Sequence, residues 1–379
     1  MHRVDDRYGA MAIMVIEEKL PVHGGTVFQA ARELGVGVEE ILDFSANINP
    51  LGMPVQAWEA LGKALNQLQH YPEMYADSLV KQIALLGNQP ESRILAGNGS
   101  TELIYLLVRV LKPKTALIVA PAFTEYQRAV KVYGGKVDFC HTRYENNFVL
   151  ETDLLIKGLE KGPDILFMGN PNNPTGSLLR PEELRPVLVA ARQSGTICII
   201  DEAFIDFADE QASMEPLVEE FENLVILRSL TKIFSLAGLR CGYLLASSML
   251  VERLRYHQEP WNVNSLAIAA AREALGDQPF QEETRRFITR ERDFLLQHLT
   301  RIPFLQTFPS RANYLLMKLD RKYSSRQLSD FLRRECRMLI RLCTDFTGLD
   351  DSFIRIAVKN RENNLKLVAA MEAFFASRP

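Results

Sequence analysis

The sequence has no excess of charge of one sign and no hydrophobic run long enough to cross a membrane. Its 379 residues include 44 Lys and Arg against 47 Asp and Glu, which gives a formal net charge of −3. This balance gives no reason to expect nucleic acid or an anionic membrane as a partner. The apolar stretch at residues 10–16 is far shorter than the roughly 20 residues that span a bilayer, and charged residues follow it instead of a signal-peptide cleavage site. We therefore expect a cytoplasmic protein.

Cysteine is scarce and is not arranged to bind a metal. The five cysteines are scattered, odd in number and without the spacing of metal ligands. Three of them fall within apolar stretches, which favours buried, reduced thiols over disulfides. We expect no metal site.

Short apolar runs alternate with helical segments through the middle of the chain. This pattern is typical of an α/β fold with a mostly parallel central sheet and helices on both faces. The runs occupy residues 116–120, 136–140, 164–168, 196–200, 224–227 and 243–246. From about Leu266 a long charged helix and short strands indicate a smaller α/β domain. We expect four segments. They are an N-terminal leader that need not be ordered (1–20), an arm that packs against the small domain and the active site (21–50), a large domain (51–265) and a small C-terminal domain (266–379).

A single lysine, Lys232, follows one of these apolar runs. A lysine among apolar neighbours loses its charge easily and can attack an aldehyde. Ser229, Thr231 and Arg240 are residue types that bind phosphate. Aldehyde capture beside a phosphate site indicates pyridoxal 5′-phosphate (PLP). The alternative is a lysine at a strand end on a solvated turn.

Polar residues at other strand ends could complete such a site. Asp201 ends a buried strand, where a carboxylate is costly unless paired, and a protonated pyridine nitrogen would pair it. A helix N-cap is the alternative role. Asn173 could hydrogen-bond the 3-oxygen of the ring or serve only as a turn residue. Phe123 could stack on the ring or belong to the core. The glycine-rich turn before Ser100 opens a helix, and such turns bind anions.

Two arginines near the C-terminus, Arg341 and Arg355, lie within apolar strands. A buried arginine normally needs an anionic partner, which could be a ligand or a structural carboxylate. The His23-Gly24 pair near the start of the chain could also bind an anion, although histidine beside glycine is often a turn.

Together these features resemble the fold-type I PLP enzymes of the aspartate aminotransferase superfamily, from His23 to Arg355. The resemblance implies that Lys232 bonds the cofactor, Asp201 pairs with its pyridinium nitrogen, Asn173 contacts the 3-oxygen and Phe123 stacks on the ring. It also implies a homodimer and a set of cofactor-phosphate contacts, which are Ser100, Thr101, Ser229, Thr231, Arg240 and, from the neighbouring subunit, Tyr71.

Within this superfamily the chain is similar to histidinol-phosphate aminotransferases and, more closely, to threonine-phosphate decarboxylases. The segments that carry the closer similarity are LDFSANINPLGMP (42–54), LAGNGSTE (95–102), DEAFIDF (201–207) and LRSLTK (227–232). The resemblance implies decarboxylation of O-phospho-L-threonine to (R)-1-amino-2-propanol O-2-phosphate and CO₂ in cobalamin biosynthesis. The substrate contacts that it implies are His23, Gly24, Asn47, Asn173, Arg341 and Arg355.

Three alternatives stay open at this point. The chain could be an aminotransferase acting on histidinol phosphate, a decarboxylase preferring O-phospho-L-serine, or a PLP-fold protein that serves as a binding module. One residue departs from the aminotransferase pattern, because Phe204 stands where that pattern has a tyrosine. A phenol at this position would donate to the 3-oxygen of the cofactor.

Overall fold

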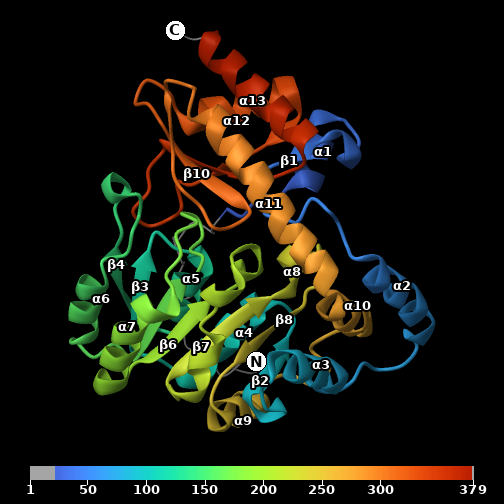
Figure 1. Cartoon of the computed structure of the whole chain (residues 1–379), viewed down its shortest axis with the longest axis vertical. Helices are drawn as coiled ribbons and strands as arrows, with labels where there is room; N and C mark the ends of the chain where they lie inside the picture. The colour runs from blue at the N-terminus through green and yellow to red at the C-terminus, as the bar shows by residue number, and fades with distance from the viewer. Residues whose placement is uncertain (1–21, 378–379) are drawn as a thin grey trace, which may run out of the picture.

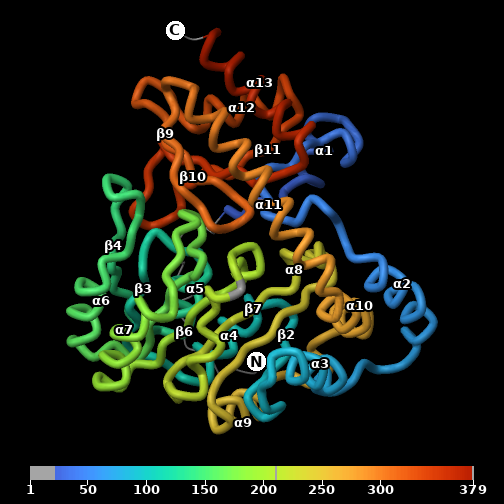
Figure 2. The backbone as a smooth tube through the Cα atoms, viewed as in Figure 1, coloured from blue at the N-terminus to red at the C-terminus, as the bar shows by residue number. Residues whose placement is uncertain are grey.

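The computed structural model describes residues 22–377, so the leader expected at residues 1–20 lies outside the described residues. Two parts, each built around its own sheet, are visible in Figure 1. The chain crosses between them through the segment before helix α2 (Val55–Ala64) and through the long helix α11 (Gln278–Leu299), as Figure 2 traces.

The larger sheet has seven strands in the order β2-β8-β7-β6-β5-β3-β4. Strands β3 to β7 pair in parallel, whereas β8 runs antiparallel to both β2 and β7. The predicted mostly parallel sheet is therefore confirmed. The strands are β2 (Ile94–Gly97), β3 (Thr115–Ala120), β4 (Lys136–His141), β5 (Ile165–Gly169), β6 (Ile197–Asp201), β7 (Leu224–Ser229) and β8 (Gly242–Leu245).

Helices cover both faces of this sheet because its strands are apolar on both sides. Along β5, Leu166 and Met168 join one core cluster, and Ile165 and Phe167 join the other. The helices on the Phe167 face are α4 (Ser100–Leu111), α5 (Thr124–Val132) and α9 (Ser248–His257). Those in the other cluster are α2, α3 (Asp77–Gly87), α6 (Thr152–Leu159), α7 (Pro181–Ser194) and α10 (Ser265–Gly276).

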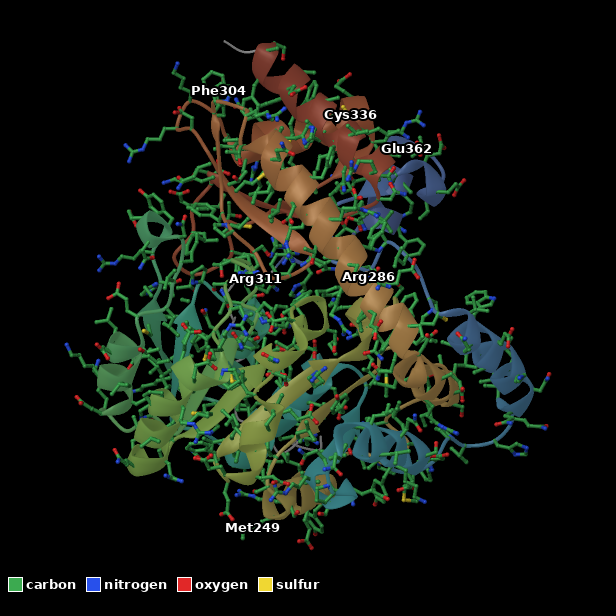
Figure 3. All side chains as sticks on the ribbon, in the orientation of Figure 1. Met249, Arg286, Phe304, Arg311, Cys336 and Glu362 are labelled. Atoms are coloured by element: carbon green, nitrogen blue, oxygen red, sulfur yellow. The ribbon has the colours of Figure 1, made fainter. Side chains whose placement is uncertain are left out.

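The smaller sheet is antiparallel, with the strand order β12-β13-β10-β9. Its strands are β9 (Leu305–Thr307), β10 (Tyr314–Leu319), β12 (Arg341–Leu342) and β13 (Phe353–Ala357). Helices α11, α12 (Ser325–Cys336) and α13 (Arg361–Ala376) pack with it (Figure 1). Arg311, labelled in Figure 3, lies where the two parts meet, and its backbone N–H donates to the carbonyl of Gly176 at 2.8 Å.

The segment before α2 joins the smaller part. Strand β1 (Leu42–Asp43) pairs in parallel with β11 (Met338–Leu339), and helix α1 (Val27–Leu34) packs on the same cluster as Leu339. The division of the chain into four segments stays a prediction. Short 3₁₀ turns occur at Val38–Glu40, Leu65–Gln67, Glu91–Arg93, Tyr144–Asn146, Ile205–Phe207, Glu210–Ala212 and Glu215–Glu219.

All five cysteines are free thiols, and Cys198, Cys241 and Cys343 are buried as expected. Among residues 22–377, no helix is both long and apolar enough to cross a membrane, and no cluster of three metal-ligating side chains occurs.

Candidate active site

A cavity of about 490 Å³ opens at the carboxyl ends of the parallel strands, between the two parts of the chain. Residues of the larger sheet, the smaller sheet and the N-terminal arm line it. Every candidate residue from the sequence except Tyr71 lies on its wall: His23, Gly24, Asn47, Ser100, Thr101, Phe123, Asn173, Asp201, Ser229, Thr231, Lys232, Arg240, Arg341 and Arg355.

Lys232 lies on the short helix α8 (Leu230–Ile233), which begins directly after β7. Its amine is 5.9 Å from the centroid of the Phe204 ring. Burial, together with the nearby charges of Arg355 and Arg240, lowers the pKa of Lys232 to about 8, against the opposing effect of Asp201. A lysine with this pKa is partly neutral near pH 7 to 8, so it can act as a nucleophile.

Asp201 is the last residue of β6 and is almost fully buried. Its Oδ2 accepts from the Tyr126 hydroxyl at 2.7 Å and its Oδ1 accepts from the Ala203 N–H at 3.0 Å. Burial raises the pKa of Asp201, although these hydrogen bonds and the charge of Lys232 oppose the rise. Within the part of the chain that the structure describes, no ion pair is formed with this carboxylate. It therefore lacks the cationic partner that a buried carboxylate needs.

The turn before α4 forms a cradle for an anion. Gly99 has φ +79°, and a Cβ built there would lie 2.6 Å from Nη2 of Arg240. A Cβ on Gly242 would lie 2.8 Å from the backbone nitrogen of Ser100. The first amides of α4 carry the positive end of the helix dipole, and Arg240 adds a full charge beside them. The hydroxyls of Ser229 and Thr231, 2.7 Å apart, complete the set of donors.

Arg355 joins two parts of the cavity wall, Asn173 after β5 and Ser45 before α2. Its Nη1 donates to Oδ1 of Asn173 and its Nη2 donates to the Ser45 carbonyl at 3.0 Å. Burial lowers the pKa of Arg355 to about 10. No carboxylate partner is formed among residues 22–377, so the guanidinium charge is available to a ligand. Because Oδ1 of Asn173 accepts from Arg355, its amide NH₂ group is left to donate elsewhere.

Arg341 differs from Arg355, because it already has a carboxylate partner. Its Nη2 donates to both carboxylate oxygens of Asp345 at 2.8 Å, and its Nη1 donates to the Leu342 carbonyl. The structural ion pair that the sequence left open is therefore present at Arg341 and, within the described residues, absent at Arg355. Asn47 is buried nearby on the cavity wall, and its Oδ1 has no hydrogen-bond partner in the described part of the chain.

The N-terminal arm closes one side of the cavity. Nε2 of His23 lies 2.9 Å from Oε1 of Glu125, and the His23 ring is 6.0 Å from the Phe123 ring. A Cβ on Gly24 would lie 2.1 Å from the Ser45 carbonyl oxygen, so only glycine allows the arm to approach this closely.

Several residues of the cavity wall were not found from the sequence, among them Glu125, Tyr126, Arg128 and Phe346. Glu125 and Tyr126 lie in α5, shortly after Phe123. The acidic residue in the first turn of this helix was the sequence feature that could have drawn attention to both. Their role depends on which residues they face, and the sequence does not contain that information.

Tyr71 does not line this cavity. Its side chain is 81% exposed and stacks on Trp261, with ring centroids 4.8 Å apart. Its reach to a neighbouring subunit stays a prediction.

The residues present fit PLP. Lys232 can bond the aldehyde, Asp201 needs a cation such as a protonated pyridine nitrogen, and the Gly99 turn forms a donor-rich cradle for a phosphate. Phe123 lies partly buried on the same wall, 5.6 Å from the Tyr126 ring, and is an aromatic side chain that could stack on the cofactor ring.

Comparisons with known proteins agree with this geometry. The family model for aminotransferase class I and II matches residues 39–371. The threonine-phosphate decarboxylase of Salmonella typhimurium is 38% identical over 350 residues, which cover 92% of this chain and 95% of that protein. Two solved structures cover 89% of this chain and 100% of their own. They are the histidinol-phosphate aminotransferase from Clostridium acetobutylicum (TM-score 0.83, 32% identity) and the L-threonine-O-3-phosphate decarboxylase from Porphyromonas gingivalis (TM-score 0.80, 27% identity). The chain therefore belongs to the class I and II aminotransferase family of PLP-dependent enzymes.

Proposed function

We propose that this enzyme decarboxylates O-phospho-L-threonine to (R)-1-amino-2-propanol O-2-phosphate and CO₂, a step in cobalamin biosynthesis. The observation that carries the proposal is the 38% identity to a threonine-phosphate decarboxylase over nearly the whole chain. The cavity supports it, since cationic groups lie there at two places, around the Gly99 turn and around Arg355. One group can hold the cofactor phosphate and the other the anions of a phosphoamino acid.

The cofactor would be held by residues on three sides. The amides of Ser100 and Thr101, with Ser229, Thr231 and Arg240, would bind its phosphate. Asp201 would pair with the ring nitrogen, the NH₂ group of Asn173 would donate to the 3-oxygen, and Phe123 would stack on the ring. The lysine that bonds the aldehyde, Lys232, lies close enough to Asp201 for their charges to interact.

When bound, PLP supplies an electron sink for whichever α-carbon bond stands perpendicular to its ring. The chain decides which bond that is by fixing the other groups of the substrate. Arg355, Arg341 and the His23-Gly24 turn would anchor the substrate phosphate, and Arg355 contributes the most charge because Arg341 shares its charge with Asp345. The α-carboxylate would then be the group that these contacts leave free to depart as CO₂.

The remaining chemistry falls to Lys232 and to the walls of the cavity. Phe123, Phe204 and Phe346 make part of the wall apolar, which disfavours a charged carboxylate relative to neutral CO₂. After CO₂ leaves, Nζ of Lys232 or a water beside it returns a proton to the α-carbon.

Substrate selection tests this proposal. Holoenzyme is given O-phospho-L-threonine or O-phospho-L-serine at equal concentration without any 2-oxo acid, and CO₂ release is measured. We expect sustained release, faster with phosphothreonine by no more than the roughly 10- to 200-fold that one methyl group allows. Preference for phosphoserine would correct the substrate, and no release from either would refute decarboxylation.

Amino transfer from histidinol phosphate is the second candidate, favoured by the likeness to the Clostridium acetobutylicum aminotransferase structure. It requires a 2-oxo acid as acceptor. Transfer from histidinol phosphate to 2-oxoglutarate, together with no CO₂ from phosphothreonine, would establish it. If the absorption band of PLP does not change when PLP is mixed with the protein, no imine with a lysine has formed, and a binding module is favoured instead.

A cytoplasmic homodimer is part of the proposal. Tyr71 and Trp261 form an exposed stacked pair, and Trp58 and Tyr75 are also solvent-exposed, as expected for aromatic residues that a second subunit covers. A dimer that donates Tyr71 to the neighbouring cofactor would lose cofactor affinity in Tyr71→Phe. A monomeric mass in analytical ultracentrifugation would contradict the dimer.

A further inference from the structure

Glu125 is a carboxylate buried in the wall of the cavity, close to the start of α5. It is 4% exposed. Three donors surround it: Nε2 of His23 at 2.9 Å, the Tyr105 hydroxyl at 2.7 Å and Nη1 of Arg128 at 3.5 Å. Burial alone would raise the pKa of Glu125, but the hydrogen bonds from His23 and Tyr105 outweigh burial, so the pKa is lowered and the side chain is ionised.

An ionised carboxylate on this wall is unexpected. The proposed substrate brings a phosphate and a carboxylate into the same cavity, and like charges repel. Glu125 is costly here unless a cation stands between it and the substrate. Two residues bind Glu125 and also line the cavity: the cationic Arg128 and the imidazole of His23.

Backbone hydrogen bonds at Val22 and Gly25 hold the segment that contains His23 in place. The Val22 N–H donates to Asp345 at 3.2 Å, and the Gly25 N–H donates to the Ser45 hydroxyl at 2.8 Å. These backbone bonds fix the arm but leave the imidazole ring free to rotate. The bond to Glu125 is the contact that fixes the ring, and it occupies Nε2, which leaves Nδ1 as the polar atom that can meet a ligand.

We propose that Glu125 is a positioning residue for substrate recognition, which holds the His23 ring in the orientation that lets Nδ1 bind the substrate phosphate. The inference rests on the proposed function and assigns its phosphate contact to a carboxylate–histidine pair. A carboxylate behind a histidine fixes the orientation of the ring. Glu125 thereby acts through His23 without touching the substrate.

A double-mutant cycle tests this coupling. Glu125→Gln keeps the shape and an acceptor for Nε2 but removes the charge, and His23→Gln removes the imidazole. Two quantities are measured on the holoenzymes: KM and kcat for O-phospho-L-threonine, and Kd for inorganic phosphate by calorimetry. Each single variant should raise both KM and Kd about tenfold, with kcat changed less than about threefold. The double variant should be no worse than His23→Gln, because the two residues act as one unit.

Tyr105→Phe is the matched control. It removes a different hydrogen bond from Glu125 while keeping the charge and the His23 contact. We expect a small loss of thermal stability and a KM within about twofold of wild type. If Tyr105→Phe raises KM as much as Glu125→Gln, Glu125 serves only the packing of the wall, and the proposal is overturned.

Two further results would also overturn it: additive effects of Glu125→Gln and His23→Gln, or an unchanged phosphate Kd in Glu125→Gln. Failure of the proposed function gives a different pattern. In that case wild type releases no CO₂, whereas the phosphate Kd values of the four proteins still report whether the pair is coupled.

Discussion

The hydroxyl of Tyr126 donates a hydrogen bond of 2.7 Å to Oδ2 of Asp201, and both side chains are buried. The Tyr126 ring stacks on Phe167, with centroids 5.0 Å apart and planes 3° from parallel. Helix α5 is thus connected to the end of β6 at the residue that is expected to face the cofactor nitrogen. Because the hydroxyl donates to the ionised carboxylate, it opposes the rise in the Asp201 pKa that burial causes.

Tyr126→Phe should therefore weaken the pairing of Asp201 with the cofactor while leaving the stacked ring in place. The lost hydrogen bond to a charged group is worth about 1.5–3 kcal/mol, which corresponds to a roughly 10- to 100-fold weaker PLP affinity. Equilibrium titration of the apoenzyme with PLP measures this. An affinity equal to that of wild type would show that the Ala203 N–H alone suffices to hold Asp201.

Gly99→Ala should weaken cofactor binding for a different reason. The added methyl group would lie 2.6 Å from Arg240 at a φ of +79°, which disfavours alanine. We expect at least a tenfold loss of PLP affinity, and a smaller rise in melting temperature when PLP is added. Gly195→Ala is a control for a positive φ alone, because Gly195 has a φ of +73° in the left-handed region and nothing within 4 Å of the added Cβ. Equal losses of PLP affinity in the two variants would mean that a positive φ, and not the cradle, accounts for the effect.

Glu202 should make the free energy of unfolding depend on pH. It is fully buried next to Asp201, accepts from Met214 N–H at 2.6 Å and lies 3.6 Å from Arg228. Burial raises the pKa of Glu202 to about 7, against the opposing charge of Arg228. The folded pKa lies above the ordinary value of 4.5, so the folded state binds the proton more tightly than the unfolded state does. Its stabilising contribution is complete below about pH 4.5 and is lost as the pH rises to about 7.

Glu202→Gln should remove this dependence. Between pH 5 and pH 8 the wild-type free energy of unfolding should fall by up to about 3 kcal/mol more than that of the variant. Urea denaturation at both pH values measures the difference. Glu220→Gln is a surface control, because its Arg185 pair is solvent-exposed and contributes little. A Glu202→Gln profile parallel to that of wild type would show that Glu202 is already ionised at pH 5 in the folded protein.

Phe204 can be tested by restoring the tyrosine of the aminotransferase pattern. The Phe204 ring is buried and meets Tyr314 edge-on at 4.9 Å, near the Lys232 amine. A phenol in this position would donate to the 3-oxygen of the cofactor and favour the unprotonated form of the bond to Lys232. In Phe204→Tyr the visible absorption band should therefore titrate at lower pH than in wild type. Absorption spectra recorded across a pH series give the titration midpoint of each protein. A midpoint in Phe204→Tyr that is higher than in wild type would contradict this role of position 204.

The strand pattern predicted the layers of the fold because apolar runs of β-type length are a local property. It also placed Asp201, Asn173 and Lys232 correctly at one edge, since the carboxyl ends of parallel strands meet there. The positions of Phe123, after β3, and of the Gly99 turn, after β2, could be predicted by the same rule.

The contacts between distant segments could not be predicted in this way. The bond from Tyr126 to Asp201 and the bond from His23 to Glu125 join residues 75 and 102 positions apart. Neither pair has a local signature, because each depends on how α5 and the arm pack. The difference between Arg341 and Arg355 has the same origin, since Asp345 forms a hydrogen-bonded ion pair with Arg341 and not with Arg355 among the described residues.

The central claim is that one lysine, held opposite Asp201, carries the cofactor. Reduction of the holoenzyme with borohydride, followed by peptide mass spectrometry, tests it most directly. The account predicts a stable pyridoxyl adduct on Lys232 alone, and in Lys232→Ala neither the adduct nor turnover above about one-thousandth of the wild-type rate. An adduct on another lysine, or multiple turnovers at the wild-type rate in Lys232→Ala, would contradict it.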